Sequence, residues 1–166
     1  MKKIILVLFA FGIAIPSFAQ VVTLPEVEVS AKNYKYLDDV KSTSAAPAVQ
    51  TIERYATSYD IRSSDFYEDE YDNYFISFFI PNGKILASYD NEGNILRTVE
   101  KYENIALPSE VAKSVAKNYP GWKITKNAYL VNYHNTQGVM RKEYKIVLEK
   151  GNEGMRIKTD ENGNIL

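Results

Sequence analysis

The sequence predicts an α+β protein in which a helix followed by antiparallel β-strands occurs twice in succession. One observation is an internal repeat, because residues 89–96 (YDNEGNIL) return as residues 159–166 (TDENGNIL). A second is helical spacing of apolar residues ahead of each copy. The third is a series of short strand-like runs, separated by turn residues, between each helix and its copy of the repeat. Strands joined by short hairpins pair antiparallel, and each helix is expected to cover one face of the sheet.

The first 19 residues have the pattern of a signal peptide. Lys2 and Lys3 precede an apolar run over residues 4–15, and Ser17 and Ala19 place small residues where a signal peptidase reads them. The run is shorter than the roughly 20 residues that a transmembrane helix needs. We therefore expect cleavage after Ala19, a periplasmic or secreted location, and no transmembrane segment in the mature chain. The sequence has no cysteine, which excludes disulfides and lipidation of a cysteine.

Residues 20–46 are expected to form an N-terminal arm and linker. Val22, Leu24, Val27 and Val29 alternate imperfectly around Pro25, which fits a short edge strand or an extended segment. Residues 42–47 have the composition of a linker.

The first α+β repeat is predicted over residues 47–101. Pro47 suits a first helical turn, Val49, Ile52 and Ala56 follow at spacings of three and four, and the helix should end near Tyr59. Four strands are expected after it, with an Asn-Gly hairpin signal at residues 82–83, over residues 61–67, 74–80, 85–89 and 95–101.

The second α+β repeat is predicted over residues 107–166. Pro108 opens a helix on which Val111, Val115 and Tyr119 form one stripe, and residues 120–121 (Pro-Gly) stop it. Strands follow over residues 122–133, 139–149 and 155–159, with a last short one at residues 165–166. The pattern leaves open whether the two repeats share one sheet.

The period of two along each strand predicts which side chains face the helices. The inward sets are Tyr74, Ile76, Phe78, Ile80, Ile85, Ala87 and Tyr89 in the first repeat, and Tyr144, Ile146, Leu148, Met155, Ile157 and Thr159 in the second.

The outward sets of the two repeats differ. In the second repeat they are mostly charged, but in the first they include Phe75, Phe79 and Leu86. Large apolar side chains on an outer face need cover, which the arm, the other repeat or a second protein could supply. These three residues are the candidate protein-binding face.

Composition and motifs argue against catalysis, cofactors and metals. With 20 basic and 21 acidic residues, the chain has no overall charge that would attract nucleic acid. His134 is the only histidine and has no cysteine or second histidine to act with. The acidic run Asp65, Glu68, Asp69, Glu70 and Asp72 lacks the spacing of a calcium loop and is interpreted as a solvated connection. We therefore expect neither an enzyme nor a cofactor or metal site.

The signal peptide and the two helix-then-strand repeats resemble the secreted PepSY-like proteins of Bacteroidetes, which are similar in fold to the β-lactamase-inhibitor protein (BLIP-like). The resemblance covers about residues 47–166. Its specific parts are residues 107–111 (LPSEV), the helix exit at residues 119–122 (YPGW), and the two Asp-x-x-Gly-Asn turns. It implies a non-catalytic protein-binding or inhibitory module whose sheet forms a concave binding surface. It supplies no catalytic residue and names no partner.

Two alternative functions remain. One is a structural envelope protein that associates with itself through its sheet, and the other is a carrier of a small apolar ligand held between helix and sheet.

Overall fold

The computed structural model describes residues 33–166 as one six-stranded sheet with helices on one of its faces. The predicted signal peptide, its cleavage site and the alternating valines of the arm lie outside the described residues. The elements, in chain order, are α1 (Tyr34–Val40), α2 (Pro47–Ser58), the short 3-10 helix η2 (Ile61–Ser63), β1 (Asn73–Ile80), β2 (Gly83–Asp90), β3 (Ile95–Glu103), α3 (Ser109–Asn118), β4 (Lys123–His134), β5 (Gly138–Lys150) and β6 (Glu153–Thr159).

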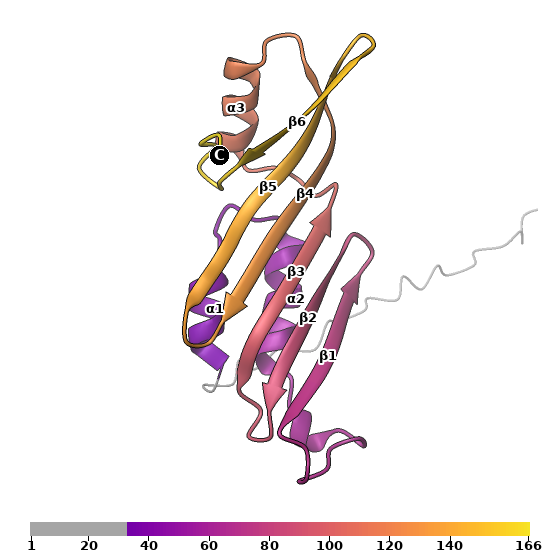
Figure 1. Cartoon of the computed structure of the whole chain (residues 1–166), viewed down its shortest axis with the longest axis vertical. Helices are drawn as coiled ribbons and strands as arrows, with labels where there is room; N and C mark the ends of the chain where they lie inside the picture. Colours follow the sequence, from indigo (N-terminus) through magenta and orange to yellow (C-terminus); the bar gives the residue numbers. More distant parts are fainter. Residues whose placement is uncertain (1–32) are drawn as a thin grey trace, which may run out of the picture.

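The six strands follow one another across the sheet in sequence order, and every neighbouring pair is antiparallel. The two predicted groups of strands are joined because β3 pairs with β4, from Arg97 opposite His134 to Glu103 opposite Ala128. The sheet is therefore continuous, which the sequence left open. Figure 1 shows the long strands β4 and β5 running past the ends of the shorter β1, β2 and β3.

The helices bury the apolar stripes that the sequence predicted. In α2, Val49, Ile52 and Ala56 are buried, and in α3, Val111 and Val115 are buried. The strands cross in front of α1 and α2 in Figure 1, so these helices lie behind the sheet, and α3 lies near the C-terminal end of the chain. The α+β class and the antiparallel sheet are confirmed.

The predicted inward faces of the strands are confirmed as well. In β2, Ile85, Ala87 and Tyr89 are fully buried, and in β5, Tyr144, Ile146 and Leu148 are fully buried. The buried residues of both groups of strands form one cluster with those of the helices. The other face of the sheet, which we call the outer face, carries the alternate residues.

The repeated Asp-x-x-Gly-Asn segments form two closely similar turns. Gly93 and Gly163 have φ angles of +86° and +85°, a region that favours glycine. In each turn the Oδ1 atom of the first aspartate accepts a hydrogen bond from the backbone N–H of the asparagine four residues later, at 2.7 Å in one and 2.8 Å in the other. A side-chain oxygen of the aspartate therefore caps each of the two tight turns.

Two local predictions are wrong. Residues 61–67 are not a strand: Ile61 is buried at the start of η2, the Asp60 carboxylate accepts the N–H of Arg62, and the chain turns before it reaches β1. The end of the arm is not extended, because it forms α1, which places Tyr36 and Val40 against the sheet. In both segments, burial of one or two side chains favours a helical backbone over the extended conformation that the local sequence pattern predicts.

Candidate functional site

The outer face of the first three strands carries an apolar patch, which consists of Phe75, Phe79, Leu86 and Val99. Phe75 and Phe79 on β1 are each 72% exposed, and Leu86 and Val99 are 43% and 45% exposed. Leu86 on β2 pairs directly with Val99 on β3. The structure therefore brings together the three residues predicted from the sequence and adds Val99. The period of two along β3 predicts that Val99 points outward, but its place beside Leu86 follows only from the pairing of β2 with β3.

Within residues 33–166, nothing covers this patch. Helix α1 contacts β4 and β5 on the helix side of the sheet, and strands β4–β6 extend the sheet sideways rather than stacking on it. Two of the possible sources of cover, the other repeat and the end of the arm, are thus excluded for the described residues. A contiguous exposed apolar patch is a typical feature of a protein-binding surface.

The outer face of strands β3–β6 has a different character, since it forms an open groove of about 770 Å³ whose lining includes six charged residues among thirteen. We call it the basic groove. Its volume lies in the range of ligand-binding clefts. Five basic residues and one acidic residue line it, namely Lys101, Lys126, Lys145, Arg156, Lys158 and Glu103.

The strand register explains how these charges meet. Lys145 on β5 lies opposite both Ala128 on β4 and Lys158 on β6. Lys101 forms an ion pair with Glu103 at 2.6 Å, and Lys158 lies 3.7 Å from Glu143. Lys126 and Arg156 form no salt bridge with any residue from 33 onward. The groove therefore keeps an excess of positive charge.

The acidic run predicted as a solvated connection occupies residues 65–72, between η2 and β1, and its five carboxylates are exposed. We call this segment the acidic connection. Tyr67 stacks on Tyr74 with ring centroids 5.4 Å apart and donates a hydrogen bond to the carbonyl of Asn91 at 3.1 Å. Tyr74 also hydrogen-bonds the backbone of Glu68. Two tyrosines thus hold the connection in a defined shape.

His134 lies at the end of β4, where its Nδ1 atom is 3.0 Å from the hydroxyl of Thr136. It lies opposite Arg97 and Gly138 in the sheet, and it forms no ion pair with a carboxylate among residues 33–166. In the part of the chain that the structure describes, no group of three or more histidine or carboxylate side chains could hold a metal ion.

The helix side of the sheet contains a pair of buried carboxyl groups that the sequence analysis missed. Glu53 on α2 is 1% exposed and Glu100 on β3 is fully buried. The Oε1 atom of Glu100 accepts from the hydroxyls of Tyr36 and Thr98, each at 2.8 Å, and its Oε2 atom accepts from Tyr102 at 2.7 Å. Desolvation raises the pKa of both carboxyl groups, and it raises that of Glu53 to about 9.

These two carboxyl groups lie between α2 and the sheet, and Glu53 also lines a small pocket between α1 and α2. Burial raises the pKa of the Tyr36 and Tyr102 hydroxyls, and the nearby Glu100 and Glu53 carboxyl groups raise it further, so all four groups lie within electrostatic reach of one another. Most residues around Glu100 in β3 are polar, so composition does not indicate that this glutamate is buried. Its burial could be predicted only from the period of two along the strand, which places it on the same face as Thr98 and Tyr102.

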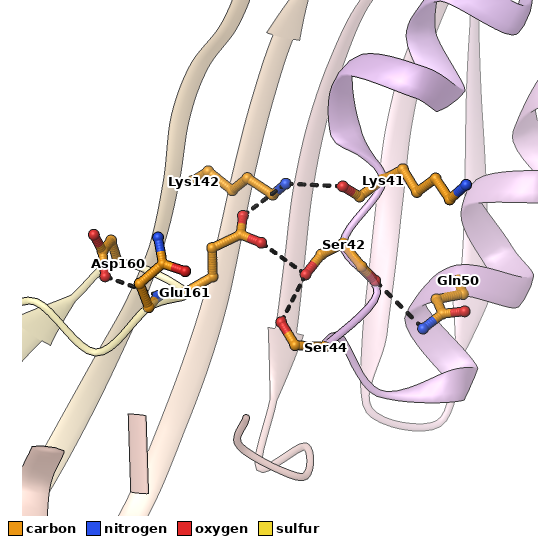
Figure 2. A network of polar contacts seen from close by, with 8 residues as sticks. Lys41, Ser42, Ser44, Gln50, Lys142, Asp160 and Glu161 are labelled. Atoms are coloured by element: carbon orange, nitrogen blue, oxygen red, sulfur yellow. Dashed lines mark hydrogen bonds and ion pairs between the residues drawn. The ribbon is translucent and has the colours of Figure 1, made fainter. Parts of the chain in front are cut away.

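A second polar network joins the α1–α2 connection to the C-terminal turn. As Figure 2 shows, Glu161 accepts a hydrogen bond from the hydroxyl of Ser42 at 2.8 Å and pairs with Lys142 of β5 at 2.6 Å. Lys142 also donates to the backbone carbonyl of Lys41 at 3.2 Å. Residues more than 100 positions apart in the chain are thus tied together, which fixes α1 and α2 relative to the end of the sheet.

Two tyrosines around the buried carboxyl groups should respond differently to loss of their hydroxyls. Tyr102→Phe removes a donor to Glu100 and leaves a buried oxygen unpaired, so we expect a loss of about 2 kcal/mol in the free energy of unfolding. The hydroxyl of the equally buried Tyr144 has no hydrogen-bond partner among the described residues. Tyr144→Phe should therefore change stability by less than about 0.5 kcal/mol, or increase it. Urea unfolding of both variants measures the difference, and equal losses would contradict the assigned hydrogen bonds.

None of the described helices is long and apolar enough to cross a membrane. No family model matches the chain, and a search of the curated proteins finds no match either. The class that the fold itself defines is an α+β protein with one antiparallel sheet, open on its outer face.

Proposed function

We propose that this protein is a secreted or periplasmic, non-catalytic module that binds another protein, in the manner of an inhibitor, through the outer face of its sheet. The observation that carries the proposal is the apolar patch, since Phe75 and Phe79 are each 72% exposed on a face that residues 33–166 leave open. Large exposed aromatic side chains near the centre of a contact supply much of the energy of protein binding.

Three further observations support the proposal. The signal-peptide pattern of residues 1–19 favours export from the cytoplasm. The order of elements, α2 followed by β1–β3 and α3 followed by β4–β6, agrees with a tandem repeat of the PepSY-like or BLIP-like kind. The apolar patch and the basic groove lie side by side on one rigid sheet, so a partner could meet both with little loss of conformational entropy.

Substitution of the patch tests this function. The purified protein, a Phe75→Ser, Phe79→Ser variant and a Tyr34→Ser control would be used to capture proteins from periplasmic and culture-medium extracts. Tyr34 is 62% exposed on α1, on the helix side, so its loss is a matched change outside the patch. We expect a captured partner to bind the patch variant at least about 30-fold more weakly, since loss of one anchor costs about 1–2 kcal/mol. Equal capture by all three proteins, or none, would contradict a binding role for the patch.

A further inference from the structure

We propose that the basic groove receives the acidic connection of a second copy of this chain, so that copies associate head to tail. This inference goes beyond the proposed function, because it concerns strands β3–β6 and residues 65–72 rather than the apolar patch.

The charges of the two surfaces are opposite and nearly equal. The groove is lined by five basic residues and one acidic residue. The connection carries five acidic residues and no basic one, in the sequence DFYEDEYD. The whole chain has a formal net charge of only −1, yet the folded molecule places a basic groove and an acidic connection in two different regions. Complementary potentials of this kind orient two surfaces and exclude other pairings.

Both surfaces are available for contact. All five acidic residues of the connection are exposed, and none forms a salt bridge with the rest of the described chain. Phe66 and Tyr71, in the same segment, are 52% and 53% exposed and could add apolar contact. Because Tyr67 and Tyr74 already fix the backbone, the connection would lose little conformational entropy on binding.

The groove and the connection cannot meet within one copy. The acidic connection leads into the first residue of β1, which pairs with the last residue of β2 (Asn73 opposite Asp90). The groove begins at the other end of these strands, at Lys101 and Glu103 near the end of β3. A strand rises about 3.3 Å per residue, so the six steps along β3 from Ile95 to Lys101 separate the two surfaces by about 20 Å. Figure 1 shows the connection beyond one end of β1 and the end of β3 at the other.

A contact between two different surfaces of the same chain is heterologous, and it gives rings or open chains rather than a closed two-fold dimer. An open chain of copies would keep one free groove at one end and one free connection at the other. This property allows the test to use two complementary variants.

The test measures the mass of the purified protein by sedimentation velocity and light scattering at concentrations up to about 1 mM. A groove variant carries Lys126→Glu and Arg156→Glu, and a connection variant carries Asp69→Lys and Glu70→Lys. A control variant carries Lys113→Glu and Lys117→Glu on α3, on the helix side of the sheet. Circular dichroism checks that each variant is folded.

We expect the average mass of the wild type and of the control to rise with concentration at about 0.05 M salt and to fall at about 0.5 M, where charges are screened. Each of the two charge variants should associate at least about tenfold more weakly than the wild type. Their equimolar mixture should form a one-to-one dimer, because one variant retains an intact groove and the other an intact connection.

Three results would overturn the proposal. A wild type that remains monomeric at all concentrations in low salt excludes the contact. A mixture that does not associate excludes the pairing of these two surfaces. Association that persists in both charge variants and is lost with Phe75→Ser, Phe79→Ser would show that copies pair through the apolar patch instead. The first two results leave the proposed function untouched, because the capture experiment measures binding of other proteins to the patch, whereas the third would assign the patch to self-association.

Discussion

Replacing Glu53 by glutamine is expected to stabilise the protein by about 3 kcal/mol near pH 8 and to change stability little near pH 4. Glu53 is almost fully buried on α2 and its pKa is raised to about 9, chiefly by desolvation and then by the neighbouring Glu100 carboxyl group. The folded protein therefore keeps a proton on Glu53 at neutral pH, whereas the unfolded chain releases it above the ordinary pKa of 4.5.

The direction of the pH effect follows from this difference. Between the unfolded pKa of 4.5 and the folded pKa of about 9, the folded state binds more protons than the unfolded state, so stability falls as pH rises. The full shift corresponds to about 6 kcal/mol, and we expect about half of it, since the buried groups and the helix can relax. Glutamine is neutral in both states and has nearly the same shape, so the variant should lose most of this slope. Glu100, whose pKa is also raised, should leave a residual slope.

Urea unfolding at about pH 4, 6 and 8 measures the effect, with linear extrapolation at each pH. Glu110→Gln is the matched control, because Glu110 is an exposed helical glutamate whose pKa is lowered by its hydrogen bond and charge interaction with Lys113. It should give no stabilisation at high pH. A wild type whose stability is constant over this range, or a Glu53→Gln variant no more stable than the wild type near pH 8, would contradict the burial of an uncompensated carboxyl group.

Replacing Gly163 by alanine is expected to destabilise the protein by about 3 kcal/mol, whereas the same change at Gly93 should cost about 1 kcal/mol. The two glycines occupy equivalent places in the repeated turns and have almost the same φ, at +85° and +86°. The cost of placing a side chain in this backbone conformation should therefore be the same at both glycines. The atoms that surround the two glycines differ.

A Cβ atom at Gly163 would lie 2.6 Å from the carbonyl oxygen of Glu110 and 2.9 Å from the Cβ atom of Ser114, both on α3. The nearest atom to a Cβ at Gly93 would be a methyl carbon of Ile61, at an ordinary 3.6 Å. The substitution at Gly163 must therefore push α3 away from the turn, and it strains the hydrogen bond from the Ser114 hydroxyl to the carbonyl of Gly163.

Chemical unfolding compares the two glycine variants directly, and hydrogen exchange of the amides in α3 reports where the damage falls. Faster exchange in α3 is expected only for Gly163→Ala. If both variants lose the same free energy, the close packing of the C-terminal turn against α3 is not an important stabilising contact.

The sequence predicted the fold best where a strong local signal agreed with the tertiary structure. Glycine conformation determines the turn at residues 90–94. The period of the apolar residues determines the inward positions Ile85 and Tyr144 and the buried stripe on α3. Both properties act over only a few residues of the chain. The prediction of a strand at residues 61–67 was wrong because no neighbouring strand pairs with it, and burial of Ile61 favoured a 3-10 turn. Helix α1 was missed because it has only seven residues and depends on the contacts of Tyr36 and Val40 with the sheet.

The candidate site was predicted in part. Phe75, Phe79 and Leu86 could be placed on the outer face from the alternation within β1 and β2 alone. The addition of Val99 required the pairing of β2 with β3, and the basic groove required the pairing of β3 with β4 and of β5 with β6. Register between strands depends on contacts between residues far apart in the chain, which a pattern along one strand does not contain.

The sequence by itself determined the class of this protein, the two repeated turns and the face of each strand that is buried, because backbone preference and hydrophobic period are local properties. Only the tertiary structure decided that the strands form one continuous sheet, that Glu53 and Glu100 share its core, and that a chain with a net charge of −1 carries a basic groove and a separate acidic connection. The physical reason is that burial and electrostatic potential depend on distances in space, and folding brings together Lys101, Lys126 and Arg156 from different strands.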